Sequence, residues 1–251
     1  VSNTIDFKNI IASGKQYTTV GRDFTVKVDA RIPNKFAGQK VFYRFAAEGV
    51  YSQIGTTFTL PEDVENFKLA VFSCSNYPAG YFNAYNSASK DKSIDMAIHL
   101  GDYLYEYKQG EYATENSISL NRQPIPNKEI ITLSDYRQRH AQYKSDIDLQ
   151  KLHSTMPVLC AWDDHEITND AWKNNAENHQ LNEGSFSQRK RNAIKAYYEW
   201  MPVREPKISF NNWKRYKIGK LIDLKLLETR ISSRSKQVNL NDYIKDGKNF
   251  Q

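Results

Sequence analysis

Three short apolar runs, each followed at once by polar residues, constrain the fold of this chain more than any other feature. They are residues 68–72 (Lys-Leu-Ala-Val-Phe), 96–100 (Met-Ala-Ile-His-Leu) and 158–162 (Val-Leu-Cys-Ala-Trp). Continuous apolar runs of this length are typical of strands that are covered on both faces. Two segments with apolar residues at helical spacing, 133–152 and 188–200, lie between and after them. We therefore predict an α/β domain over residues 63–251.

Residues 1–62 follow a different pattern, with a period of two. Segments 24–30 and 41–45 alternate apolar and polar residues, and segment 52–60 is rich in β-branched and aromatic residues before Pro61. Such patterns indicate half-buried antiparallel strands. We predict that residues 1–62 form a small antiparallel β-sandwich domain that is incomplete at its start.

The composition supports a folded chain and leaves its partners open. With 251 residues, of which 39% are hydrophobic, the chain can bury one large core or two smaller ones. Its 35 basic and 29 acidic residues give a net charge of +6, which suits phosphorylated or otherwise anionic substrates as well as nucleic acid. No stretch approaches the ~20 apolar residues that a membrane span requires. The first residues lack the features of a signal peptide, so we expect neither element in this sequence.

The residues that follow the three apolar runs are of types that bind metal ions. Cys74 follows the first run, and residues 101–106 (Gly-Asp-Tyr-Leu-Tyr-Glu) follow the second. The third is followed by residues 163–166 (Asp-Asp-His-Glu), with Asn169 and Asp170 close behind. Ligands of open α/β sheets bind beyond the carboxyl ends of the strands, where these side chains would meet. The sequence therefore predicts a metal site at this edge of the sheet.

Repulsion between like charges is the reason to expect a metal after the third run. Three acids around a histidine repel one another at a strand end unless a cation compensates them. In the alternative interpretation, Asp163 or Asp164 caps the next helix while Glu166 faces solvent. That alternative accounts for one of these residues more readily than for all of them.

The cysteines and the remaining histidines are interpreted one by one, because two cysteines are too few for a disulfide framework. Cys160 lies inside the third apolar run and is expected in the core. The serines beside Cys74, and its place after a strand, favour metal ligation over burial. His99 directly precedes residues 100–102 and is placed to orient a ligand. We expect three others to be ordinary helix or surface residues: His140, His153 and His179.

With these motifs the sequence resembles the alkaline phosphatase D family, a branch of the calcineurin-like metallophosphoesterases. The resemblance implies a metallophosphoesterase-like sheet with helices, preceded by an immunoglobulin-like domain. Family members continue well past the end of this chain and supply further metal ligands there, so we expect that the chain is a fragment or that the protein continues in a second chain. The segments that carry the resemblance are 43–45, 55–61, 72–74, 99–106, 136–144 and 162–170.

By this resemblance, the predicted site holds two metal ions. Asp102 would bridge them, and Cys74 and Tyr105 would bind Fe³⁺, which thiolate and phenolate stabilise. Asp164 would bind the second metal, Ca²⁺ or another divalent cation, because hard cations prefer oxygen ligands. His165 would be the catalytic histidine.

Other residues would surround these ligands. Asn169 or Asp170 would complete the second metal site. Asp163, Glu166 and Arg137 are expected to support the ligands or to contact the substrate, since a metal site depends on the residues around its ligands.

The resemblance implies metal-dependent hydrolysis of phosphate mono- or diesters. Two metal ions would bind the phosphate and activate a water or oxo group for in-line attack. His165 would stabilise the developing charge or protonate the leaving alcohol. The resemblance also implies a secreted, periplasmic or extracellular location, whereas the oligomeric state is not predicted.

Two other functional classes stay open. A catalytically incomplete chain would act as a binding module for anionic polymers or cell-surface ligands, in line with its net positive charge. Residues 213–217 (Trp-Lys-Arg-Tyr-Lys) mix basic and aromatic side chains, as surfaces that bind nucleic acid do. One such run is weak evidence, so we expect no specific nucleic-acid recognition.

Overall fold

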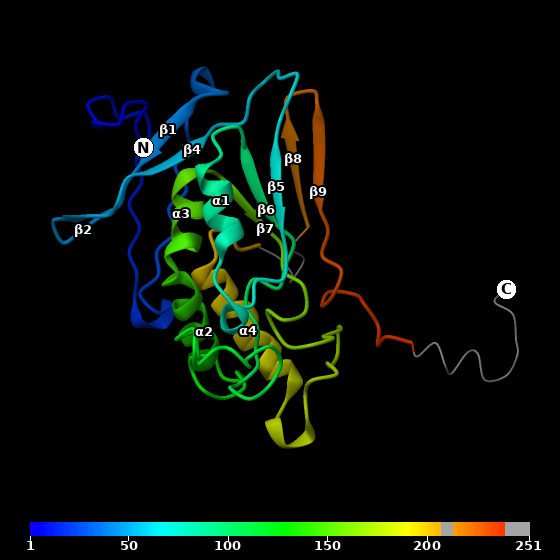
Figure 1. Cartoon of the computed structure of the whole chain (residues 1–251). Coiled ribbons are helices and arrows are strands. Elements are labelled where there is room, and N and C mark those ends of the chain that lie inside the picture. The colour runs from blue at the N-terminus through cyan, green and yellow to red at the C-terminus, as the bar shows by residue number, and fades with distance from the viewer. Residues whose placement is uncertain (207–212, 239–251) are drawn as a thin grey trace, which may run out of the picture.

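A parallel three-stranded sheet lies at the centre of the computed structural model, which describes residues 1–206 and 213–238 (Figure 1). Its strands are β5 (Leu69–Phe72), β6 (Met96–His99) and β7 (Val158–Cys160), in the order β5-β6-β7. Strand β6 is buried along its whole length because it lies between the other two. The three predicted strands are confirmed, and their carboxyl ends lie at one edge of the sheet.

Four α-helices of the described residues pack in two pairs. Helix α1 (Asn83–Lys90) contacts α3 (Ile147–Thr155), and α2 (Leu133–Lys144) contacts α4 (Phe186–Trp200). None of the helices in the described part of the chain is long and apolar enough to cross a membrane. The helix expected over residues 188–200 is therefore confirmed, with its start at Phe186.

The single helix expected over residues 133–152 is wrong, because the chain forms two helices there. Asp146 separates them: its carboxylate accepts the backbone N–H groups of Asp148 (2.9 Å) and Leu149 (3.0 Å), which caps the start of α3. The same carboxylate pairs with the buried guanidinium of Arg122 at 2.8 Å. A continuous helix would take this carboxylate away from both sets of donors.

Buried tyrosines fill much of the core, and their hydroxyl groups bind the loops that follow the strands. A buried phenol needs a hydrogen-bond partner for its polar tip. Tyr136 donates to the carbonyl of Ile167 at 2.5 Å. Tyr143 accepts the backbone N–H groups of Tyr77 (3.0 Å) and Tyr105 (3.3 Å). The core thereby fixes the backbone at the edge where the predicted site lies.

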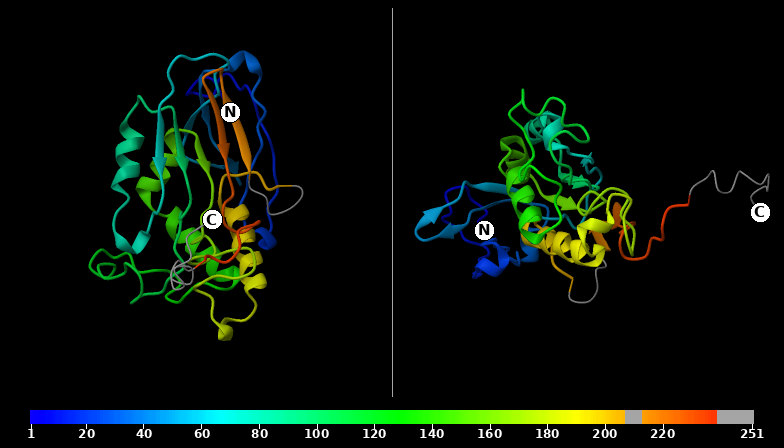
Figure 2. Two further views of the ribbon diagram at one scale, coloured as in Figure 1. Left: turned by 90° about the vertical axis from the view of Figure 1, so that its right-hand side faces the viewer. Right: turned by 90° about the horizontal axis from the view of Figure 1, so that it is seen from below.

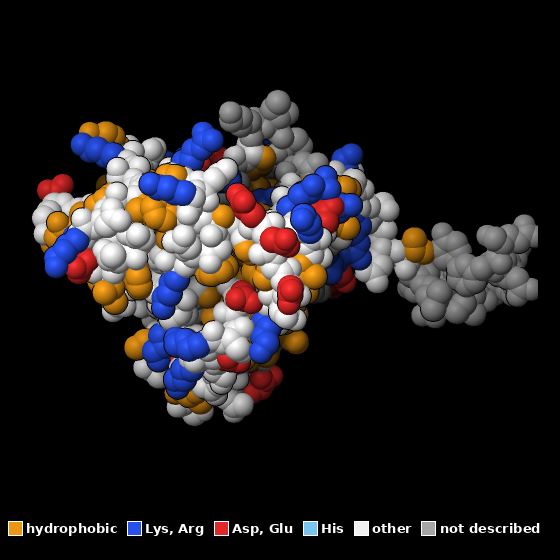
Figure 3. All heavy atoms as spheres, turned by 90° about the horizontal axis from the view of Figure 1, so that it is seen from above, with side chains coloured by type: hydrophobic (Ala, Val, Ile, Leu, Met, Phe, Trp, Pro, Cys, Tyr) orange, Lys and Arg blue, Asp and Glu red, His pale blue; other side chains and the backbone are white. Residues whose placement is uncertain are grey.

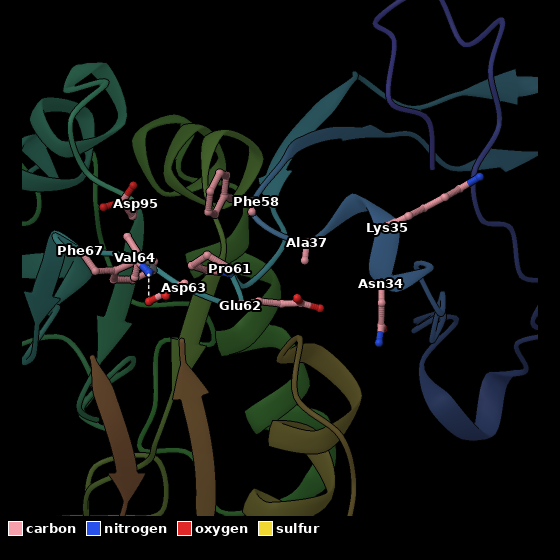
Figure 4. Close-up of a pocket in the computed structure, with 11 residues that line it drawn as sticks. Asn34, Lys35, Ala37, Phe58, Pro61, Glu62, Asp63, Val64, Phe67 and Asp95 are labelled. Atoms are coloured by element: carbon pink, nitrogen blue, oxygen red, sulfur yellow. Dashed lines mark hydrogen bonds between the residues drawn. The ribbon is translucent and has the colours of Figure 1, made fainter. Parts of the chain in front are cut away.

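The N-terminal part contains two small antiparallel sheets in place of the expected β-sandwich. Strand β1 (Lys40–Tyr43) pairs with β4 (Gly55–Phe58), and β2 (Ala46–Ala47) pairs with β3 (Val50–Tyr51). The immunoglobulin-like arrangement is not confirmed. A cavity of about 600 Å³ lies where this part meets the sheet. Figure 4 shows the residues that line it, Phe58, Pro61 and Val64 among them. No predicted site residue lines that cavity.

The strand expected over residues 24–30 is not formed. Phe24 and Val26, the first two apolar residues of the alternating pattern, are 69% and 40% exposed. Lys27 instead donates to the backbone oxygens of Tyr198 and Val203 at the C-terminal end of α4, where carbonyl groups lack partners within the helix. A period of two predicts a strand only where a second strand is present to pair with it.

Residues 214–226 form a hairpin of strands β8 (Lys214–Ile218) and β9 (Ile222–Leu226). The hairpin lies beside β7, as Figure 2 shows. Arg215, from the basic and aromatic run, pairs across the hairpin with Asp223 at 2.5 Å. This pairing neutralises one of the basic residues that suggested nucleic-acid binding.

We predict that Asp146→Ala lowers the free energy of unfolding by about 3 kcal/mol. The substitution removes a helix cap, worth about 1 kcal/mol, and leaves the buried Arg122 guanidinium without its carboxylate. Urea denaturation measures the change. Asp148→Ala is the matched control, because Asp148 pairs with the exposed Lys151 and the loss of stability is expected to be below about 1 kcal/mol. Equal losses in the two variants would contradict the role given to Asp146.

Candidate metal centre

The turn after β6 brings two loops into contact. Gly101 and Asp102 both have positive φ angles, of 120° and 53°. A Cβ atom at Gly101 would lie 2.3 Å from the backbone nitrogen of Asp163, in the loop after β7. Only glycine permits this approach. The approach places Asp102 beside the residues that follow β7.

Four predicted residues gather around the carboxylate of a fifth, Asp102. Potential ligand atoms of Asp102, Asp164 and His165 all lie within 4.8 Å of one another, and the three residues are buried. The sulfur of Cys74 lies 3.3 Å from Oδ2 of Asp102, and the hydroxyl of Tyr105 lies 3.5 Å from the same oxygen. Thiol, phenol, carboxylate and imidazole groups from three strand ends therefore meet at one place.

Without a cation, the environment of these groups favours their protonated forms. Burial raises the pKa of Asp102 and of Asp164 above the usual carboxyl value, although the charge of His165 opposes both shifts. Burial and the nearby Asp102 carboxylate also raise the pKa values of Cys74 and Tyr105. A metal ion binding here would displace protons and supply the missing positive charge. The donor set fits a metal site on chemical grounds.

Glu106 fixes the ring of His165. This fully buried carboxylate accepts from Nδ1 of His165 at 2.7 Å and from the backbone N–H of Asn169 at 2.7 Å. Thr168 and Asn178 donate to it as well, at 3.1 and 2.9 Å. Burial alone would lower the pKa of His165, but the bond to Glu106 and its charge outweigh that effect and raise it to about 9.

Glu166 connects the two loops. Its carboxylate accepts three backbone N–H groups: those of Asp102 (3.1 Å), Tyr103 (2.7 Å) and Asp163 (2.8 Å). Glu166 is 2% exposed, so the alternative in which it faces solvent is wrong. Burial, and then the charge of Asp102, raise its pKa to about 8, while the three N–H groups act in the opposite direction.

Arg230 is a charged neighbour of the cluster that the sequence did not predict. Its guanidinium pairs with the carboxylates of Asp163, Asp164 and Asp170, at 3.3 Å for Asp164 and 3.4 Å for Asp170. Part of the repulsion for which we expected a metal ion is thus compensated by this side chain. Its partners lie at least 60 residues away in the chain, which no local pattern reveals.

The loop that carries Arg230 is fixed by a buried carboxylate. Glu228 accepts the backbone N–H groups of Arg230 (2.8 Å), Ile231 (2.7 Å) and Ser232 (2.8 Å). It also accepts the indole N–H of Trp162, at the end of the third apolar run, at 3.1 Å. The position of Arg230 is therefore tied to the strand end that carries the acidic residues.

Two predicted residues point elsewhere. The side-chain amide of Asn169 donates to Glu177 at 3.0 Å, and its backbone N–H binds Glu106. Arg137 forms two hydrogen bonds, of 2.7 and 2.8 Å, with Glu199 on α4, and a third with the carbonyl of Gly21. Arg137 was expected to support the metal ligands or to contact the substrate. Its guanidinium instead pairs with a buried carboxylate between two helices.

His99 and His140 are both buried. Nε2 of His99 lies 3.2 Å from the hydroxyl of Ser75 and 2.9 Å from that of Tyr85, and its Nδ1 accepts the N–H of Gly101 at 3.3 Å. His99 therefore supports the loops below Cys74 and Asp102. His140, expected to be an ordinary helix or surface residue, is fully buried within α2.

We predict that the pair of His165 and Glu106 makes the stability of the metal-free protein depend on pH. The pKa of His165 is about 9 in the folded chain and about 6.5 when unfolded, so the pair contributes about 3 kcal/mol below pH 6.5. That contribution is lost as the pH rises through 9. Urea denaturation in a chelator between pH 6 and pH 9.5 measures it. In His165→Gln this part of the pH dependence is expected to vanish, and an unchanged profile would refute the assignment.

We also predict that Arg230→Ala destabilises the metal-free protein by about 2 kcal/mol, since three neighbouring carboxylates lose their shared cation. Calcium is expected to raise the melting temperature of this variant more than that of the wild type, because an added cation restores the compensation. Arg215→Ala serves as the control, as its partner is an exposed carboxylate. Equal calcium responses of the two variants would count against the role of Arg230.

Comparisons with known proteins match most of this chain. The model of the PhoD-like phosphatase family matches residues 69–250, and that of its N-terminal domain matches residues 1–61. Alkaline phosphatase D of Bacillus subtilis (strain 168) is 35% identical over 233 residues, which are 89% of this chain and 38% of that protein. A solved structure of PhoD has a TM-score of 0.82 and 33% identity, over 95% of this chain and 45% of that one.

This chain therefore spans less than half the length of either relative. The family model alone matches well over half of the chain. The chain belongs to the PhoD-like phosphatase family.

Proposed function

We propose that this chain forms the metal-binding core of an enzyme that hydrolyses phosphate mono- or diesters. The observation that carries the proposal is the meeting of Cys74 and Tyr105 at one carboxylate oxygen of Asp102. Potential ligand atoms of Asp164 and His165 lie within 4.8 Å of the same carboxylate. Membership of the PhoD-like phosphatase family supports the same reaction class. The secreted, periplasmic or extracellular location that the resemblance implies stays a prediction.

The donor types support two different metal ions. We assign Fe³⁺ to Cys74, Tyr105 and Asp102, because thiolate and phenolate stabilise a ferric ion. A hard divalent cation such as Ca²⁺ is assigned to Asp102 and Asp164, whose oxygens it prefers. When bound, such ions supply Lewis acidity toward the phosphate oxygens.

His165 is proposed as the catalytic residue that handles a proton. With a pKa of about 9 it carries its proton at neutral pH. Because Glu106 accepts the hydrogen of Nδ1, the hydrogen on Nε2 is the one that remains for the leaving oxygen. Glu106 thus orients the ring and also keeps it charged, as a general acid at neutral pH requires.

A cavity beside Cys74 offers room for the ester group. Its volume is about 320 Å³, and Asn76, Phe82 and Tyr85 are among the residues that line it. Cys74 itself is exposed, so the proposed centre opens to solvent on this side. Both polar side-chain atoms of the Asn76 amide are buried without a partner among the described residues, which leaves them available to a bound ligand.

The described residues favour an enzyme over a binding module for anionic polymers. Figure 3 shows Lys and Arg side chains mixed with Asp and Glu side chains over the face seen from above. A polyanion-binding surface would instead gather charge of one sign.

The test is hydrolysis of p-nitrophenyl phosphate and bis-p-nitrophenyl phosphate with iron and calcium present, together with elemental analysis. We expect the protein to retain iron, and Asp102→Ala to lose both the metal and at least about 100-fold of the activity. His165→Asn is expected to keep the metal and to lose about 100-fold of the activity. Asp223→Asn, which changes an exposed carboxylate on β9, is the control and should match the wild type. Activity that survives Asp102→Ala combined with His165→Asn would disprove the proposal.

A further inference from the structure

Lys144, the last residue of α2, has no carboxylate partner among the residues that the structure describes. Its ammonium group donates to the hydroxyl of Tyr103 at 2.6 Å and lies 4.4 Å from the centre of the same ring. No ion pair joins it to an acidic side chain anywhere in residues 1–206 and 213–238. A cation removed from water without a counter-ion is unfavourable unless something else compensates it.

The side chain lies at the wall of a cavity of about 340 Å³. Gln150 and His153 are polar residues of the same wall, while Tyr43 and Trp200 belong to its apolar part. This volume, and a largely apolar wall with a few polar groups, are typical of sites for small organic ligands. No residue of the candidate metal centre lines the cavity.

His153 supplies a second donor to this wall. The hydroxyl of Tyr103 accepts a hydrogen from Lys144, so its own hydrogen is free to point to Nε2 of His153, 2.8 Å away. The neutral ring of His153 then carries its hydrogen on Nδ1. Burial lowers the pKa of His153 well below the usual value, which keeps the ring neutral. Lys144 has further ammonium hydrogens, since only one is used by Tyr103.

We propose that this cavity is a binding site for a small organic carboxylate. The ammonium of Lys144 and the Nδ1–H of His153 bind its two oxygens, and its apolar body lies against Tyr43 and Trp200. A carboxylate fits better than a phosphate dianion, because the wall offers one cation and no guanidinium. The site is independent of the proposed phosphoesterase reaction, because it uses none of the metal-centre residues.

The lowered pKa of Lys144 is consistent with an ammonium group that has no negative charge beside it. Burial lowers its pKa to about 8, and the nearby Cys160 opposes this shift without reversing it. At pH 7 the ammonium form still dominates, so a bound anion would meet a charged partner. The anion would also raise the pKa of Lys144, because an opposite charge nearby favours the charged form.

The test is titration of the full chain at pH 7 with benzoate, followed by NMR, with neutral benzamide as the matched ligand. We expect benzoate to bind with a Kd of about 1 mM and Lys144→Met to weaken it by at least about tenfold. Lys151→Met, which changes an exposed lysine on α3, should bind benzoate like the wild type. Benzamide is expected to bind none of these three proteins.

A second measurement keeps the proposal testable if Lys144→Met does not fold. The pKa of Lys144 is read in the wild-type chain from its ¹³Cε signal, and saturating benzoate is expected to raise it by at least about half a unit. Three results would each overturn the proposal: equal binding of benzamide and benzoate, benzoate binding with no change at Lys144, or inorganic phosphate displacing benzoate at equal concentration.

Discussion

The candidate site depends on the hydrogen bonds that the carboxylate of Glu166 accepts. This carboxylate binds three backbone N–H groups from two loops that follow neighbouring strands. A buried carboxylate is tolerated only where such donors surround it. Gly101 makes the arrangement possible, because any side chain there would collide with the backbone of the second loop. Without this contact, Asp102 and His165 would belong to separate loops with no fixed distance between them.

The buried tyrosines also help to fix the geometry of the candidate site. Tyr136 and Tyr143 are fully buried, yet each uses its hydroxyl group to bind the backbone of a loop at the sheet edge. Large aromatic groups supply buried apolar area, and their polar tips restrict the loops. The many tyrosines of this chain therefore link the packing of the core to the geometry of the site.

The sequence predicted what depends on local pattern and on the geometry of parallel sheets. Apolar runs located β5, β6 and β7, and the rule that ligands gather at strand ends brought Cys74 and Asp102 together. It could not predict Arg230, whose partners are remote in the chain. Asp146 was also missed, since the helical pattern continues through it while its carboxylate binds groups that only the fold brings near.

Two predictions were wrong although the local pattern behind them is present in the sequence. Segment 24–30 has the alternation of a strand, but no second strand of the described residues pairs with it, and Lys27 contacts the end of α4 instead. Arg137 was placed near the substrate because it is basic and belongs to a family motif. Its actual partner, Glu199, lies on another helix. Neither outcome is encoded in the spacing of neighbouring residues.

The contacts of Arg230 have a consequence for the order in which the protein is assembled. Because Arg230 already pairs with Asp163, Asp164 and Asp170, part of the repulsion between these carboxylates is balanced before any metal ion binds. Folding can thus come first and loading with metal second.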